Sequence, residues 1–185
     1  EYTATIGSSI VTCKKHDNRY DVEGEIRLGE CRLTKDFQPV ALLPFFRKAE
    51  RPSGKPSETA GRIKLNILIR NDKNLWIDNN LAKFRIRSNL DVTGTAAKPN
   101  LTGRLSVEEG YVFYLDKKFQ IEKGTMDFID PNRINPVIDL SAVASLKEYQ
   151  TMSRTAYTVN LTVTGALDEA VVGLSAEPAL DKPDI

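Results

Sequence analysis

Residues 91–110 read DVTGTAAKPNLTGRLSVEEG, which is an alternating strand, a short turn and a second alternating strand. Residues 162–178 repeat this pattern as TVTGALDEAVVGLSAEP, and residues 22–33 echo its second half as VEGEIRLGECRL. A repeated strand–turn–strand unit predicts a stack of strands that grows in one direction. The repeat therefore points to an extended architecture and not to a catalytic centre.

The same alternation of apolar and polar side chains runs through most of the chain. Residues 62–70 and 84–93 carry an apolar side chain at nearly every second position, with Ser88 as an interruption. Such alternation is typical of strands with one apolar and one solvated face. We therefore expect an all-β fold without helices, forming a single β-rich domain over residues 1–185. The residues expected on the apolar face are Ile63, Leu65, Ile67, Ile69, Phe84, Ile86, Leu90, Val92, Leu101, Leu105, Val107, Val159, Leu161 and Val163.

Turns are expected where proline, glycine and short polar residues cluster. Residues 98–100 and 168–169 should connect paired strands, and two proline phrases should break the chain between Ile129 and Val137. Residues 122–124, with the sequence Glu-Lys-Gly, should form a tight hairpin.

Residues 39–61 differ from the rest because they are rich in proline, glycine, serine and basic residues. We expect a flexible loop over residues 47–60. The segment before it contains Leu42, Leu43, Phe45 and Phe46. These side chains could anchor the loop against the sheet, or they could form a docking or gating element, since exposed Leu and Phe are costly.

The composition excludes several classes of function. The net charge is +1, with 26 basic and 25 acidic residues, so no strong attraction to nucleic acid or to anionic membranes is expected. No apolar run reaches the roughly 20 residues that span a bilayer, and the chain does not begin as a signal peptide does. Its abrupt ends suggest a fragment of a longer protein.

The two cysteines leave two alternatives open. Cys13 and Cys31 could form one disulfide, as in an oxidising compartment. A hairpin turning at residues 15–18 would instead place Cys13 opposite Tyr20 and Cys31 opposite Tyr2, leaving two free thiols.

The residues that carry enzymatic chemistry are sparse. His16 is the one histidine, and no nucleophile motif, phosphate-binding glycine loop or metal-ligand spacing is present. Scattered carboxylates could pair as in glycosidases, although solvated strand faces explain them better; these are Asp78, Asp91, Asp127, Asp130 and Asp139. We therefore expect no catalysis, no metal and no cofactor.

A series of phrases, in order, resembles the C-terminal domain of the TamB family, the AsmA-like inner-membrane subunits of the translocation and assembly module. The phrases are GTAAKPNLTGRL at 94–105, EEGYVF at 108–113, FQIEKGTMDF at 119–128, NPVIDL at 135–140 and LSAEPAL at 174–180. The turn at residues 165–170 departs from the pattern because it lacks the expected proline.

This resemblance implies a curved, elongated sheet rolled into a trough, or taco-like groove, with an apolar interior. It also implies a periplasmic location, within an inner-membrane-anchored protein of a Gram-negative-type cell. The implied partners are phospholipid acyl chains and a TamA-type outer-membrane barrel protein.

Three hypotheses follow. In the first, the apolar-face residues line a groove that conducts phospholipid between the inner and outer membranes. In the second, the chain is an assembly factor for outer-membrane proteins, whose open sheet edge pairs with a TamA-type barrel or shields client β-strands. In the third, the apolar faces cover each other and the chain is an ordinary β-sandwich binding module or enzyme.

Overall fold

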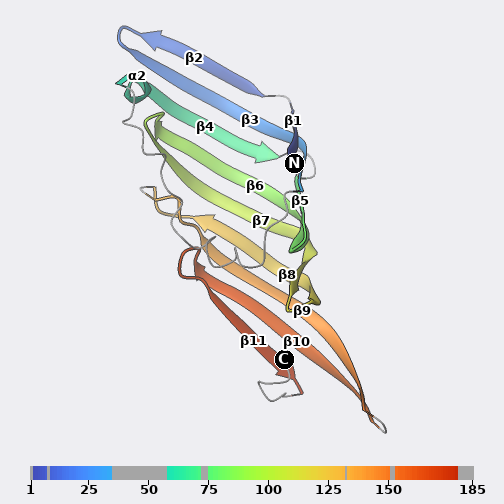
Figure 1. Cartoon of the computed structure of the whole chain (residues 1–185). Helices are drawn as coiled ribbons and strands as arrows, with labels where there is room; N and C mark the ends of the chain where they lie inside the picture. Colours follow the sequence, from blue (N-terminus) through green and yellow to red (C-terminus); the bar gives the residue numbers. More distant parts are fainter. Residues whose placement is uncertain are drawn as a thin grey trace.

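A computed structural model of the chain describes residues 2–7, 9–34, 58–71, 75–131, 133–150 and 153–178. These described residues form one 11-stranded sheet and one short helix (Figure 1). The strands are β1 Tyr2–Ile6, β2 Ile10–His16, β3 Arg19–Leu33, β4 Ile63–Asn71, β5 Leu75–Asp78, β6 Ala82–Thr95, β7 Lys98–Tyr114, β8 Lys117–Phe128, β9 Val137–Gln150, β10 Ser153–Ala166 and β11 Val171–Glu177, and the helix is α2 Glu58–Gly61. The expected all-β class is confirmed.

The sheet is a curved, open trough. Its strand order is β1-β3-β4-β6-β7-β8-β9-β10-β11, with β2 beside β3, and β5 beside β3 and β6. Neighbouring strands are antiparallel, except that β4 and β5 run parallel to β3. Among the described strands the two ends of the order do not meet, so the trough is not a closed barrel (Figure 1).

The ends of the strands form two long rims. The β2–β3, β6–β7 and β10–β11 turns lie along one of them, which we call the Ala97 rim. The β7–β8 turn and the short strand β5 lie along the opposite one, which we call the Leu115 rim (Figure 1).

The cross-strand register gives the sheet one apolar and one polar face. Ile67 lies opposite Val92, and Val92 lies opposite Leu101. Farther along, Leu161 lies opposite Ala142, which lies opposite Ile121. Because opposed residues point to the same side of a sheet, these rows form one continuous apolar surface, the inner face. The alternate positions form the outer face.

Strand β8 is continuous, so the hairpin expected at residues 122–124 is wrong. The register between β8 and β9 shifts between Ile121 and Lys123, which makes Glu122 a bulge. The sequence signal was Gly124, which serves packing instead: a Cβ there would lie 2.7 Å from Val107 Cγ2. The turn that joins β7 to β8 is at Leu115 and Asp116, whose φ angles are 47° and 57°.

A second bulge lies in the neighbouring strand. The register between β6 and β7 shifts after Arg85, which leaves Glu108 as the extra residue of β7. Strands β7 and β8 keep one register with each other on both sides of the bulges, from Gly103 opposite Phe128 to Tyr114 opposite Lys117. The two bulges therefore compensate, and the inner face stays in phase.

Of the other expected turns, the one after β6 is misplaced and the later ones are found. The connection between β6 and β7 is at residues 96–97, so the expectation of a turn at residues 98–100 is wrong by two positions. Thr95 pairs directly with Lys98, and Pro99 is already part of β7 opposite Gly94, whose φ of 87° suits glycine. The turn at residues 168–169 and the break between Ile129 and Val137 are confirmed.

The helix α2 contradicts the expectation of a chain without helices. It is a single turn, too short to show a helical period in the sequence. It is held by its surroundings, since the amide of Ala97 donates to the carbonyl of Ala60 at 3.1 Å. Of the expected loop at 47–60, residues 58–60 lie in this helix. Residues 47–57, and Leu42, Leu43, Phe45 and Phe46, lie outside the described residues.

Both cysteines are free, so the disulfide alternative is not the one found. Cys13 is exposed on β2 opposite Val22, and Cys31 lies opposite Ala4. The expected opposition to Tyr20 and Tyr2 is wrong by two positions. The β2–β3 turn contains only residues 17 and 18, so His16 pairs with Arg19.

Candidate functional site

The apolar-face residues expected from the sequence all lie on the inner face. Ile67 and Ile69 of β4 oppose Val92 and Leu90 of β6. On its other side, β6 is opposed by Leu101, Leu105 and Val107 of β7. Val159, Leu161 and Val163 of β10 join the same surface through β9 and β8. Residues far apart in the sequence thus form one apolar surface that crosses the sheet.

The sequence pattern did not predict several residues of the inner face. Phe119 and Ile121 are 3% and 8% exposed, and Ala142 and Ala144 are 1% and 6% exposed. The misassigned hairpin hid the first two, because it divided β8 at its bulge. The small side chains of β9 gave a weak signal, because Val143 interrupts the alternation of Leu140, Ala142 and Ala144 with Ser141 and Ser145.

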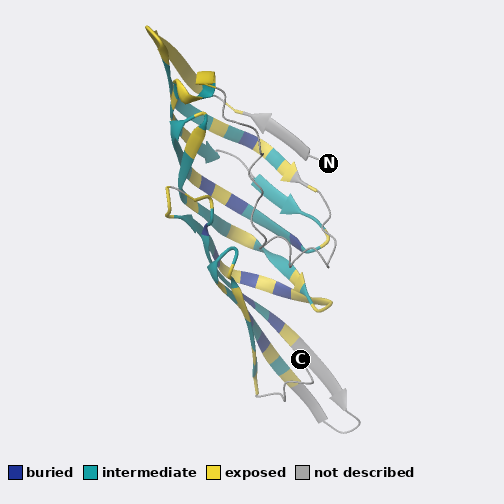
Figure 2. Ribbon diagram, turned by 60° about the vertical axis from the view of Figure 1, so that its left-hand side comes forward, coloured by how far each residue is buried: buried dark blue, intermediate teal, exposed yellow. Residues whose placement is uncertain are grey.

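The inner face is packed to different degrees along the trough. Val159 and Leu161 are 1% and 2% exposed, and they belong to a cluster that includes Phe119 and Ile121. On β4 the inner residues Ile63, Leu65, Ile67 and Ile69 are all half-buried, and they alternate with exposed outer residues. Figure 2 shows this alternation along the strands. The β8–β10 part of the face is therefore closely packed, and the β4 part is open.

Ser88 is a polar position within the inner face, and its role is structural. It is 3% exposed, and both its backbone N and its Oγ donate to Asn71 Oδ1, at 2.6 and 3.1 Å. Asn71 Nδ2 in turn donates to the carbonyl of Ile86 at 2.9 Å. These bonds satisfy the backbone of β6 between the end of β4 and the start of β5.

The outer face carries ion pairs between neighbouring strands. Arg70 lies 3.1 Å from Asp91, and Arg104 lies 2.5 Å from Asp127. The hydrogen bond and charge of Asp127 raise the pKa of Arg104 above its ordinary value. Lys123 lies 2.5 Å from Asp139. Four of the five carboxylates considered for acid–base chemistry are thus paired with cations; they are Asp78, Asp91, Asp127 and Asp139.

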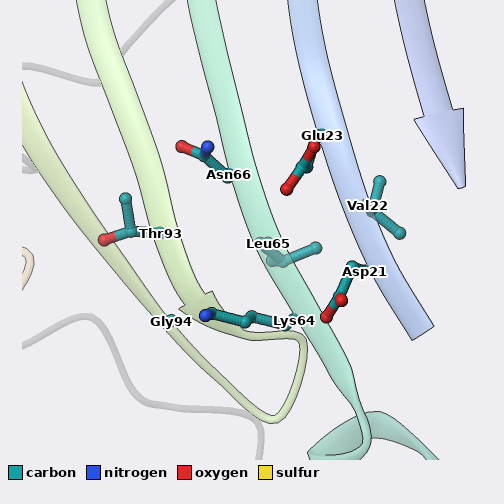
Figure 3. Close-up of a pocket in the computed structure, with 8 residues that line it drawn as sticks. All are labelled: Asp21, Val22, Glu23, Lys64, Leu65, Asn66, Thr93 and Gly94. Atoms are coloured by element: carbon teal, nitrogen blue, oxygen red, sulfur yellow. The ribbon is translucent and has the colours of Figure 1, made fainter. Parts of the chain in front are cut away.

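A shallow depression of about 290 Å³ lies on this outer face (Figure 3). Polar side chains from β3, β4 and β6 line it, among them Asp21, Glu23, Lys64, Asn66 and Thr93. Ligand sites for small molecules are mostly apolar and are usually larger. The depression is therefore a poor site for a lipid, and it lies on the side opposite to the apolar surface.

The Asn-Pro phrase forms a clamp between two turns. Asn135 Nδ2 donates to Asp168 Oδ1 at 2.7 Å, and the amide of Leu167 donates to the carbonyl of Pro136 at 2.9 Å. Arg133 also contacts Asp168. The clamp ties the β8–β9 connection to the β10–β11 turn, so these residues position strands rather than bind a ligand.

Two absences among the described residues bear on the class of site. They contain no helix that is both long and apolar enough to cross a membrane. In the same part of the chain, no three His, Cys, Asp or Glu side chains are grouped as metal ligands would be. The feature that remains is the apolar inner face itself.

Comparison with known proteins shows the family of this chain. The family model of the TamB C-terminal domain matches residues 1–185, which is the whole chain. A search of curated proteins finds no match to the chain.

Proposed function

Because this chain belongs to the TamB C-terminal domain family, we propose that its inner face carries phospholipid acyl chains along the trough. The family serves in transport and assembly at the cell envelope and the outer membrane, and it is not a known enzyme family. Its members span the envelope of Gram-negative cells with periplasmic segments, and they partner with TamA-type proteins. In this proposal the present chain is such a periplasmic segment.

The observation that carries the proposal is an apolar face on which the described residues place no second sheet. The described strands form one sheet, and within them no second layer packs on the inner face. An apolar surface of this extent is costly in water and marks a site that binds an apolar partner. Acyl chains fit this surface because they need no directional bonds.

Simple energetics support an acyl chain as the ligand. Burial contributes about 0.8 kcal/mol per methylene, so a chain of about fifteen carbons gains roughly 10 kcal/mol before entropic costs. An apolar lining holds the chain equally well at any depth, since it offers no preferred contact. A lipid can then slide along the trough, as a conduit requires.

The uneven packing suggests where the acyl chain lies. The inner residues of β4 and the facing part of β6, such as Ile67 and Leu90, are only half-buried and can accept it directly. The β8–β10 part is filled by its own side chains, so a passing lipid must displace contacts there. We therefore place resting lipid against β4 and β6.

Site-specific photocrosslinking tests this proposal. A benzophenone amino acid at Ile67 or Leu90 should capture phospholipid in cells. The matched control is Leu68, which is 38% exposed on the outer face next to Ile67. Capture at Ile67 of nothing but side chains from the same chain, or equal lipid capture at Leu68, would refute it.

An assembly role is the second candidate, and the exposed edge strand favours it. Val171 and Val172 of β11 are 66% and 43% exposed, and among the described strands β11 pairs only with β10. An open edge can add a strand from a barrel or a client. Val172→Pro should then abolish binding of a TamA-type protein and leave lipid crosslinking at Ile67 intact. If lipid capture fails and this binding is lost, assembly is the better account.

A further inference from the structure

The β7–β8 turn is an unusual place for a leucine. Leu115 and Asp116 both have positive φ, as the central residues of a type I′ turn do. Asn, Asp and Gly are the usual residues there, because larger side chains crowd the backbone in the left-handed region. Leu115 is also 60% exposed, so its side chain gains little packing within the chain. Neither the turn nor the core explains it.

Two aromatic rings stand next to this turn on the outer face. Phe113 is 40% exposed, and its ring meets the ring of Tyr111 edge to face, with centroids 5.3 Å apart. Lys118 Nζ lies 3.8 Å from the centroid of the Tyr111 ring. The turn therefore presents aliphatic, aromatic and cationic groups together at the Leu115 rim.

Two lysines of this hairpin differ from the paired cations of the outer face. Elsewhere Arg70, Arg104 and Lys123 are paired with carboxylates. Lys117 and Lys118 are exposed, and in the described part of the chain neither forms an ion pair with a carboxylate. These cations are available to an external anion.

We propose that the β7–β8 turn inserts into the surface of an anionic phospholipid bilayer. Leu115 and Phe113 enter between the headgroups, and Lys117 and Lys118 meet the lipid phosphates. Exposed aliphatic and aromatic side chains beside lysines are the composition found at membrane interfaces. The contact is local, so the small net charge of the whole chain does not oppose it.

This contact is separate from lipid carriage by the inner face. Tyr114 and Phe119, next to the turn, pack in the apolar cluster of the inner face. Insertion of the turn would thus bring the Leu115 rim of the trough against a bilayer. Either property can be present without the other.

The opposite rim offers a matched control. Ile129 and Ile134 are 70% and 61% exposed in the β8–β9 connection, so they resemble Leu115 in exposure. The aromatic residue next to their loop, Phe128, is half-buried, whereas Phe113 is exposed, and Arg133 of the loop is paired with Asp168. Non-specific hydrophobic binding by exposed aliphatic side chains would occur at both rims equally.

Vesicle flotation of the 185-residue chain tests the proposal. Wild type should float with vesicles of phosphatidylcholine and phosphatidylglycerol. Leu115→Asn should bind them roughly tenfold more weakly, since one large apolar side chain no longer enters the lipid. Because Asn suits positive φ, its melting temperature should not fall. Ile129→Asn should bind as wild type does.

A charge variant separates the contribution of the lysines to vesicle binding from that of Leu115. Lys117→Gln should weaken binding to the mixed vesicles and leave binding to pure phosphatidylcholine unchanged. Unchanged flotation of Leu115→Asn, or an equal loss in Ile129→Asn, would overturn the proposal. So would a wild-type chain that self-associates or binds a protein through this turn while failing to float.

Lipid crosslinking at Ile67 distinguishes this inference from the proposed function. If lipid carriage is right, Leu115→Asn should keep that crosslink when lipid is supplied in detergent micelles. Loss of the crosslink at Ile67 in the wild type, with vesicle flotation intact, would refute carriage and support the membrane contact.

Discussion

The inner face behaves differently on β4 and on β10, although both strands alternate in the same way. Val159 and Leu161 on β10 are almost completely buried, whereas the inner residues of β4 are only half-buried. The small Ala142 and Ala144 of β9 leave room for larger neighbours to close over them. On β4 the neighbour Gly24 of β3 offers no side chain opposite Ile67. Alternation determines which face a residue joins, and the cross-strand neighbours determine how tightly it packs.

The largest test of this contrast places a carboxylate on each part of the inner face. Val159→Asp should destabilise the fold by about 4 kcal/mol or more, because the charge is buried without a partner. Ile67→Asp should cost about 1–2 kcal/mol, since its carboxylate keeps contact with water. Urea unfolding measures both, with Val159→Ala and Ile67→Ala as controls for lost volume. Equal effects of the two Asp variants would mean that the two regions are packed alike.

The next test addresses the packing between the two bulges. Gly124→Ala should cost about 1–3 kcal/mol, because its Cβ would lie 2.7 Å from Val107 Cγ2. Val107→Ala in the same chain should recover much of that loss. A double-mutant cycle by urea unfolding checks the coupling. Independent, additive effects would show that the two positions do not touch.

An effect of similar size is expected at the polar position of the inner face. Asn71→Leu removes the acceptor for Ser88 and should cost about 1–3 kcal/mol, because the amide of Ser88 then lacks its partner. Ser88→Ala should cost less, since its backbone bond to Asn71 remains. Thermal unfolding and amide exchange at Ser88 measure the difference. If the two substitutions are equal, the backbone bond contributes little.

The smallest effect should come from the outer face. The exposed pair Arg70–Asp91 should couple by less than about 1 kcal/mol in a double-mutant cycle, and the coupling should fall in high salt. A larger, salt-independent coupling would mean that the ion pairs of the outer face contribute to stability as the packing of the inner face does.

The sequence was a good guide to faces and a poor guide to register. The alternation of Ile63, Leu65, Ile67 and Ile69 was sufficient to place them together, because period two is a local property of the strand. The bulge at Glu122 was read as a turn, since a bulge depends on the neighbouring strand and leaves only a weak local signal. The real turn at Leu115 was missed because leucine is rare in that conformation.

The inner face, too, was only partly predictable from the local sequence pattern. Most of it followed from alternation, yet the burial of Phe119 and the openness of β4 depend on contacts between strands. The resemblance of ordered phrases supplied the trough shape that alternation alone left undecided. The clamp between Asn135 and Asp168 accounts for one of those phrases in terms of strand placement.

The compensating bulges restrict which insertions and deletions the β7–β8 hairpin can accept. Each arm contains one extra residue, at Glu108 and at Glu122, and the two arms stay in register with each other. Deleting Glu108 alone would leave the arms unmatched, so that one of them must slip or bulge anew. Deleting both residues would restore a regular ladder through all of the neighbouring strands. Changes of length in this hairpin should therefore be tolerated in pairs, one in each arm, as a frameshift is corrected by its counterpart.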